Sequence, residues 1–204
     1  MKKKRQNRVA RAIEVFHDHG GILRTARALR LGIHPETLYR MRDEGTLETL
    51  SRGLFRIANL TELGNPDLIA VSIRCPQGVL CLISALSFHG ITTEVPHAVD
   101  LALPRGAERP RIDHPPVKIY WTVPHIFKCG IEQHLVDGRT VRVYSAERTL
   151  VDCFRYRNKI GLDTAIEALR LYRERKPVQV DAIMDCARTC RAARIIRPYL
   201  EGIL

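Results

Sequence analysis

Four side chains close together in the chain have the chemistry needed to contact double-stranded nucleic acid. The guanidinium of Arg40 can donate two hydrogen bonds to the edge of a guanine, and Thr37 can contact a base or the methyl group of thymine. Tyr39 can donate to a phosphate or pack on a sugar. Glu36 can accept a hydrogen bond from cytosine, but phosphates would repel it if it were misplaced. These residues define the first candidate site.

A helix over residues 35–44 is predicted to position these side chains. Pro35 is tolerated at the first position of a helix, and Gly45 is typical of a helix end. Leu38 and Met41 lie three residues apart and therefore form an inward-facing stripe. The side chains that this spacing directs outward are Glu36, Tyr39, Arg40 and Asp43, with Thr37 and Arg42 on the flanks.

Another helix is predicted near the start of the chain. Residues 8–17 have apolar side chains at helical spacing, namely Val9, Ile13 and Phe16. Two glycines at positions 20 and 21 end this helix. The cationic run at residues 2–5 precedes it and is expected to be a disordered arm.

A short helix is also predicted between these two. Residues 22 and 23 lead into it, Thr25 is its expected N-cap, and Ala26 and Leu29 face inward. The sequence Leu-Gly-Ile at residues 31–33 then turns the chain toward the helix at residues 35–44. A short helix, a glycine-containing turn and a second helix are typical of a helix-turn-helix, whose second helix enters the major groove of DNA.

A hairpin is predicted directly after this unit. Residues 47–50 and 54–57 are extended, and the chain reverses between them at Ser51, Arg52 and Gly53. Such a hairpin is the wing of a winged helix. Arg52 at its tip is placed to reach a phosphate or the minor groove.

The charge of the chain favours a polyanionic partner. The net charge is +11, and residues 1–60 hold 13 Lys and Arg against 6 Asp and Glu, an excess of +7. We expect Arg24, Arg27 and the run at residues 2–5 to hold the phosphate backbone. The complete set of side chains expected at the DNA is Arg24, Thr25, Arg27, His34, Glu36, Thr37, Tyr39, Arg40 and Arg52.

A linker predicted at residues 59–66 divides the chain into a winged helix-turn-helix domain at residues 1–60 and an α+β domain at residues 66–204. In the second domain, strands in the middle and helices at the ends favour a mainly antiparallel sheet with flanking helices. Asp137-Gly138 suits the two positive φ angles of a hairpin turn, and Ser145 is expected to cap a helix. Helices are predicted at residues 67–74, 79–88, 145–156, 163–174, 180–190 and 192–200, and strands at residues 97–103, 117–122, 131–136 and 139–144.

The second domain offers polar side chains but no recognisable catalytic set. Asp100 lies in a predicted strand, as acidic residues of nucleases do, but the next strand at residues 118–121 has no second acid. Paired carboxylates after Gly-Ser, a P-loop and histidines at metal-ligand spacing are absent from the sequence. Glu147 and Asp152 are expected to form structural ion pairs with nearby arginines. The other candidates are His89, His97, His114, His125 and His134.

The cysteines do not point to a metal either. The chain has six, mostly in apolar segments and without a CxxC pair. Cys186 and Cys190, four apart on a predicted helix, could form half a metal site, but buried free thiols are the favoured interpretation. We therefore expect no catalytic residue, no metal and no cofactor. A nuclease or nucleotidyltransferase targeted by a winged helix stays open as the alternative.

The run GGILRTARALRLGIHPETLYRMRDEGTLETLSRGLFRI resembles the N-terminal winged helix of the AbiEi family of antitoxins and transcriptional regulators from type IV toxin-antitoxin systems. The matching residues include the double glycine, the T-L-Y-R of residues 37–40 and the R-G of the hairpin. The runs SALSFHGIT and YSAERTLVDCFRYRNKIG resemble the second domain of that family more loosely. The resemblance assigns DNA reading to Thr37, Tyr39, Arg40 and Arg52.

The resemblance also implies partners. The N-terminal domain of that family binds an inverted repeat in the operator and represses its own operon. The second domain antagonises a cognate toxin that resembles a nucleotidyltransferase, without a stable complex. A monomer or weak dimer, with two copies on the DNA, is therefore expected. The longest apolar run, residues 78–86, is shorter than the roughly 20 residues that span a bilayer, and no secretory signal is recognised, so no membrane association is expected and the cytoplasm is the expected location.

Overall fold

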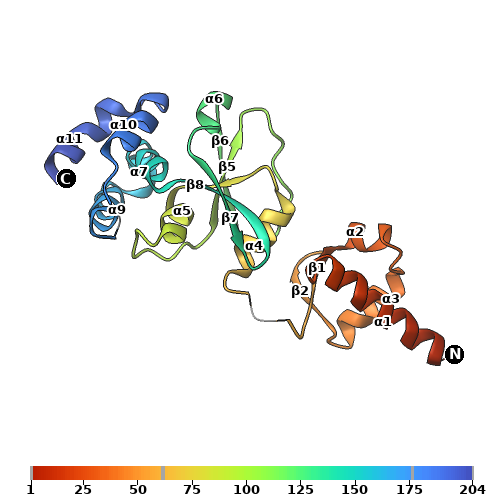
Figure 1. Cartoon of the computed structure of the whole chain (residues 1–204). Helices are drawn as coiled ribbons and strands as arrows, with labels where there is room; N and C mark the ends of the chain where they lie inside the picture. The colour runs from red at the N-terminus through yellow and green to blue at the C-terminus, as the bar shows by residue number, and fades with distance from the viewer. Residues whose placement is uncertain (1, 61–62, 176, 204) are drawn as a thin grey trace. The chain divides into compact units, whose positions relative to one another are not determined.

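The chain forms two compact units in the computed structural model, which describes residues 2–60, 63–175 and 177–203 (Figure 1). The first unit contains residues 1–70 and 113–115, and the second contains residues 71–112 and 116–204. The predicted linker includes residues 61 and 62, which lie outside the described part of the chain. The boundary between the units falls within α4 (Pro66–Arg74), and Asn65 caps this helix by accepting a hydrogen bond from the Leu68 amide.

The described residues of the first unit form helices around a small sheet with the strand order β1-β3-β2. Both strand pairings are antiparallel. The winged helix-turn-helix architecture predicted from the sequence is thus confirmed. The elements are α1 (Lys2–Asp18), β1 (Ile22–Arg24), α2 (Thr25–Arg30), α3 (Pro35–Asp43), β2 (Leu47–Ser51) and β3 (Leu54–Ile57).

One prediction for the start of the chain was wrong. The cationic run at residues 2–5 continues α1 and is not a disordered arm, because Lys and Arg are good helix formers and no breaker separates the run from the helix. Residues 22 and 23 were expected only to lead into the next helix; residues 22–24 form β1, which pairs with residues 54–56 of the hairpin. That pairing joins segments about thirty positions apart, which a local pattern cannot reveal.

The inner face of α2 also differs from the prediction. Ala28 is fully buried, whereas Ala26 is exposed and Leu29 is 39% exposed. The reason is that β1 runs straight into α2, so that Arg24 and not Thr25 is the N-cap. The amide of Thr25 donates to the Gly53 carbonyl of the wing at 2.9 Å, which fixes the rotation of the helix.

The turn between α2 and α3 depends on Gly32. Its φ is +88°, a left-handed conformation that glycine adopts without strain. The Gly32 and Ile33 amides donate to the carbonyls of Leu29 and Ala28, and this turn inserts Ile33 into the core. The core of the first unit also contains Phe16 and the inner residues of α3.

The second unit contains a sheet with the strand order β6-β5-β4-β8-β7. The pairs β5–β6 and β4–β8 are parallel, and the pairs β4–β5 and β7–β8 are antiparallel. The α+β class is confirmed, but the sheet is mixed and not mainly antiparallel. The strands are β4 (Val79–Leu80), β5 (Val99–Pro104), β6 (Val117–Thr122), β7 (Ile131–Val136) and β8 (Arg139–Tyr144).

A two-residue strand accounts for one of the two parallel pairs, β4–β8. Residues 79–88 were predicted as one helix, but Val79 and Leu80 form β4, which sits between β5 and β8 in the sheet. The predicted hairpin turn is confirmed, with φ angles of 48° at Asp137 and 72° at Gly138.

The helices of the second unit pack around α7. Figure 1 shows α7, α9, α10 and α11 gathered on one side of the sheet. Ser145 caps α7 as predicted, accepting a hydrogen bond from the Arg148 amide at 3.2 Å. The helices are α5 (Leu82–His89), α6 (Pro124–Phe127), α7 (Ala146–Arg155), α8 (Arg157–Ile160), α9 (Leu162–Arg175), α10 (Val180–Thr189) and α11 (Ala193–Ile203). Within the described ranges, no helix has the length and apolar character needed to cross a membrane.

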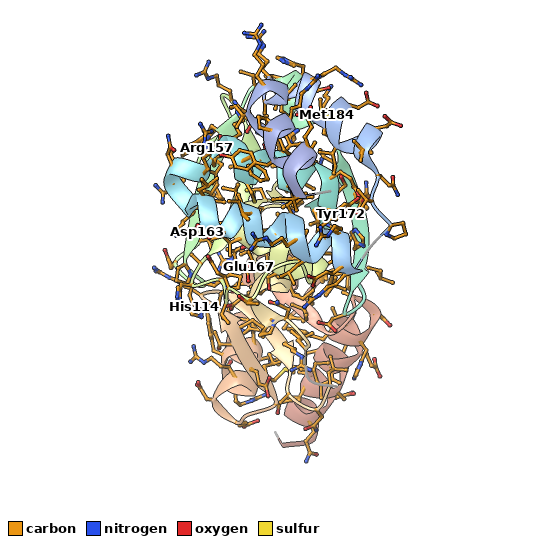
Figure 2. All side chains as sticks on the ribbon, turned by 90° about the vertical axis from the view of Figure 1, so that its left-hand side faces the viewer. His114, Arg157, Asp163, Glu167, Tyr172 and Met184 are labelled. Atoms are coloured by element: carbon orange, nitrogen blue, oxygen red, sulfur yellow. The ribbon has the colours of Figure 1, made fainter. Side chains whose placement is uncertain are left out.

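Polar contacts tie these helices together inside the core. The buried Tyr172 of α9, labelled in Figure 2, donates from its hydroxyl to the Glu147 carboxylate of α7 at 2.7 Å. Arg148 and Asp152 form the kind of structural ion pair that the sequence predicted, with 3.0 Å between Nε and Oδ2. Because both side chains are buried, this ion pair is part of the core packing of α7 and is not an ion pair on the surface of the helix.

Candidate nucleic-acid interface

The inner face of α3 is packed against the core of the first unit. Leu38 and Met41 are fully buried, as the spacing predicted. Thr37 is only 4% exposed, so its side chain lies inward and not on a flank. A contact between Thr37 and a base stays a prediction, and the burial of the Thr37 side chain counts against it.

Tyr39 is the largest side chain on the outer face of α3, and it is 41% exposed. Its ring meets Phe55 of the wing edge to face, with the ring centroids 6.4 Å apart. The Arg42 guanidinium lies 5.1 Å from the centroid of the Tyr39 ring and 2.6 Å from the Asp43 carboxylate. These contacts position the Tyr39 ring while its surface remains accessible.

Arg40 lies between the inner and outer faces of α3, with its side chain partly exposed. Its Nε is 3.8 Å from the carboxylate of Glu44, one turn further along the helix. An exposed ion pair of this kind contributes at most about 1 kcal/mol. Arg40 can therefore exchange Glu44 for a base or a phosphate at small cost.

His34 and Glu36 form the beginning of α3. The Glu36 amide donates to Nδ1 of His34 at 3.3 Å, so His34 serves as the N-cap. Both side chains are exposed. The carboxylate of Glu36 in the first turn is favoured by the helix dipole, which supplies a structural reason for this acid besides contact with a base.

The wing presents Arg52 at its tip, where its side chain is 88% exposed. Its guanidinium is 3.8 Å from the carboxylate of Asp113, a residue assigned to the same unit. The φ of +68° at Gly53 allows the chain to reverse there. Thr25 donates from its hydroxyl to the Gly53 carbonyl at 3.2 Å, so its observed role is to hold the turn of the wing.

Other cations of the unit lie on α1, β1, α2 and β3. Arg24 and Arg27, expected at the phosphate backbone, are exposed. Arg8 and Arg11 on α1 were missed as candidates, although their spacing of three residues already places them on one helix face. Arg56 is buried and donates to the Leu60 carbonyl at 2.7 Å, so it is a structural residue.

Asp100 and His89, two of the polar candidates from the sequence, have partners within the fold of the second unit. Asp100 is buried, and burial raises the pKa of its carboxyl, while Lys118 and a hydrogen bond from Tyr120 oppose the shift. Nε2 of His89 is 2.7 Å from the Tyr144 carbonyl, a contact within the fold. Among the described residues, no three His, Cys, Asp or Glu side chains are arranged to hold a metal ion.

The cysteines are free thiols, as the favoured interpretation of the sequence held. Sγ of Cys186 lies 3.9 Å from Sγ of Cys129, and burial raises the pKa of the Cys186 thiol to about 12. A thiol with such a pKa is protonated at neutral pH and is a poor nucleophile.

A short helix, a glycine turn, a second helix with an accessible polar face and a hairpin wing define a winged helix-turn-helix domain. Residues 10–58, about a quarter of the chain, match the family model described as "Transcriptional regulator, AbiEi antitoxin", so the resemblance inferred from the sequence is confirmed over this segment. No curated protein sequence matches the chain.

A solved structure is similar over nearly the whole chain. The crystal structure of the RV2827C protein from Mycobacterium tuberculosis superimposes with a TM-score of 0.55 and 13% sequence identity. The match covers 97% of this chain and 82% of that chain. At this identity the likeness shows a shared fold, which includes elements of both units.

Proposed function

We propose that the protein is a transcriptional repressor that binds double-stranded DNA through α3 and the wing. In this proposal α3 enters the major groove, Arg40 and Tyr39 contact bases and backbone, and Arg52 reaches an adjacent phosphate or the minor groove. Arg24 and Arg27 add sequence-independent contacts to the backbone. The observation that carries the proposal is the accessible polar face of α3, held on a fully buried stripe, within the segment that matches a family of regulators.

The proposed operator is an inverted repeat read by two copies of the chain, because a repeat of this symmetry presents the same bases twice. A monomer or weak dimer in solution is sufficient if the two copies meet on the DNA. Repression follows from occupancy of the operator of the protein's own operon.

We further propose that the second unit antagonises a toxin that resembles a nucleotidyltransferase, so that the protein is an antitoxin and not itself an enzyme. The support is the family description matched by residues 10–58. The proposed location is the cytoplasm, where both DNA and such a toxin would be reached. The test is co-expression with a nucleotidyltransferase-like protein from a neighbouring gene. Rescue of growth by the full chain, with α3 altered so that it no longer binds DNA, would support the antitoxin role.

The main test is a gel-shift titration on the DNA upstream of the protein's own gene. Replacing Arg40 by alanine should weaken operator binding by about 1–3 kcal/mol and reduce discrimination at one base pair. The matched control is Arg188→Ala, which removes an arginine from another exposed helical ion pair, the one with Asp185 on α10, and should leave affinity unchanged. Unchanged operator affinity in Arg40→Ala would contradict the proposed orientation of α3.

The cationic run at residues 2–5 has a different expected role. Replacing all four residues by glutamine should weaken binding to operator and unrelated DNA alike, because these charges carry no sequence information. The slope of log affinity against log salt should fall by about 0.9 for each phosphate that the variant no longer neutralises. Gel shifts at several salt concentrations measure both quantities. A weakening confined to the operator would instead assign base reading to this run.

A further inference from the structure

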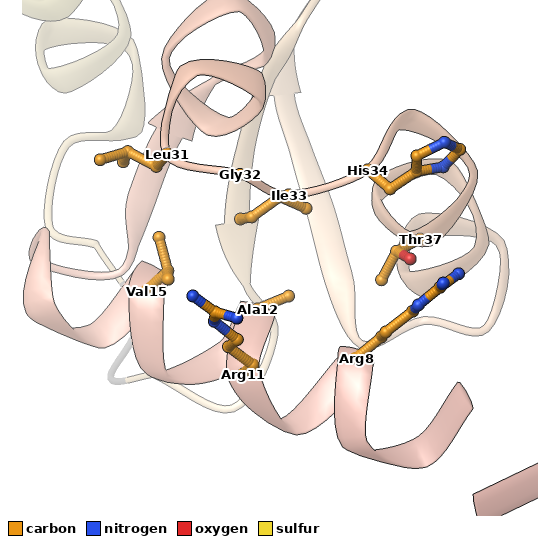
Figure 3. Close-up of a pocket in the computed structure, with 9 residues that line it drawn as sticks. All are labelled: Arg8, Arg11, Ala12, Val15, Leu31, Gly32, Ile33, His34 and Thr37. Atoms are coloured by element: carbon orange, nitrogen blue, oxygen red, sulfur yellow. The ribbon is translucent and has the colours of Figure 1, made fainter. Parts of the chain in front are cut away.

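A pocket of about 300 Å³ lies within the first unit, between α1 and the turn of the helix-turn-helix (Figure 3). This volume is at the lower end of the range of about 300–1,000 Å³ for ligand pockets, so it suits a small molecule. Its walls come from α1, from the turn before α3 and from the first turn of α3. The lining residues are Arg8, Arg11, Ala12, Val15, Leu31, Gly32, Ile33, His34 and Thr37.

The charge of this lining is entirely positive or neutral. Arg8 and Arg11 supply two guanidinium groups, and none of the nine residues is an acid. Figure 3 shows the Arg8 side chain extending from α1 toward Thr37 and His34. Nδ1 of His34 accepts from the Glu36 amide, so a neutral His34 carries its proton on Nε2 and offers a further donor.

A hydroxyl of α3 lies in the same wall. Thr37 is only 4% exposed, and its side chain lines the pocket. A threonine hydroxyl can donate a hydrogen bond to an anionic group that enters the pocket. This placement also gives a role to a threonine that packs inward where the sequence predicted a flank.

The other half of the lining is apolar. Ala12 and Ile33 are buried, and Val15 and Leu31 are partly buried beside them. A phosphate of the DNA backbone would use the two arginines but would leave this apolar part uncovered. A small molecule with an anionic group and an apolar body satisfies both halves.

We propose that this pocket binds a small organic anion, whose phosphate or carboxylate lies between Arg8 and Arg11 and whose apolar part contacts Ala12 and Ile33. The hydroxyl of Thr37 donates to the anionic group. The site is distinct from the outer face of α3, and the proposal does not depend on DNA binding. A ligand here contacts the turn that sets the position of α3.

The test is a titration of the ¹⁵N-labelled full chain with phenyl phosphate at constant ionic strength, followed by the amide resonances. The expected result is a saturable shift of the amides of Gly32, Ile33 and Thr37. Inorganic phosphate should bind about tenfold more weakly, because it lacks the apolar part. Arg11→Gln should weaken phenyl phosphate binding about tenfold or more, because charge-assisted hydrogen bonds are removed. Arg30→Gln, an exposed arginine of α2 outside the pocket, should bind as the wild type does.

Three results would overturn the proposal. The first is the absence of a saturable shift at these amides in the wild-type chain, a measurement that does not depend on any variant folding. The second is equal affinity in wild type and Arg11→Gln. The third is equal affinity for phenyl phosphate and inorganic phosphate while a short DNA duplex shifts the same amides, since the pocket would then hold a backbone phosphate. Because the first titration contains no operator, failure of the proposed repressor function leaves its outcome unaffected.

Discussion

Replacing Arg148 by alanine is expected to lower the free energy of unfolding of the second unit by about 3–5 kcal/mol, since removing one partner of a buried ion pair leaves the other charge uncompensated. Arg148 is 1% exposed. Its guanidinium donates to the Asp152 carboxylate and to the carbonyls of Ile126 and Cys129, and it lies 4.4 Å from the Tyr144 ring centroid. The substitution removes all of these interactions at once.

The destabilisation should depend on pH, and the direction follows from Asp152. Burial already raises the pKa of this carboxyl, and Arg148 lowers it, so alanine at position 148 should raise that pKa further. A raised native pKa means that the native state is favoured below the unfolded pKa of about 3.9 and is penalised as the pH rises through the native value. The deficit of Arg148→Ala should therefore grow as the pH increases above about 4.

Urea unfolding followed by the fluorescence of Trp121, the single tryptophan, measures this effect in the second unit. Arg188→Ala, which removes an exposed pair, should change stability by less than about 0.5 kcal/mol. The double variant Arg148→Met/Asp152→Leu should recover most of the stability, because an apolar pair leaves no buried charge. A single variant as stable as the wild type at neutral pH would show that the ion pair is not needed.

Replacing Leu38 by alanine should destabilise the first unit by about 2–5 kcal/mol and reduce operator binding in proportion to the fraction unfolded. Leu38 is fully buried in the core that supports α3, together with Phe16, Ile33 and Met41. The substitution leaves a cavity directly beneath the outer face of that helix. Affinity should therefore fall even though Leu38 does not contact DNA.

The matched control is Leu29→Ala, in which the same side chain is removed from a position that is 39% exposed. We expect a change of less than about 0.5 kcal/mol. Circular dichroism during thermal unfolding measures both variants, and a gel shift measures binding. Equal destabilisation by Leu38→Ala and Leu29→Ala would contradict the observed packing, in which Leu38 and Ala28 face the core and Leu29 faces outward.

Much of the interface region, and some turns and caps of the second unit, could be predicted from the sequence because their signals are local. The helix at α3 follows from Pro35, the three-residue spacing of Leu38 and Met41, and a terminal glycine. The hairpin turn at Asp137 and Gly138 and the cap at Ser145 are likewise specified by residues within a few positions. Such signals depend on backbone conformation and neighbouring side chains, which any stretch of sequence carries with it.

Only the tertiary structure decided how distant strands pair and that Ala28 and Thr37 face the core. The strand β1 exists because it meets β3 about thirty residues away, and the two-residue β4 exists because β5 and β8 flank it. The rotation of α2 follows from the bond between Thr25 and Gly53, and the burial of Thr37 follows from the packing of α1 against the turn before α3. These features arise from contacts between distant segments, whose free energy depends on the whole unit being folded. The sequence by itself determined the helix-turn-helix and the outward direction of Glu36, Tyr39 and Asp43, while the packing of α1 against the turn created the pocket beside them.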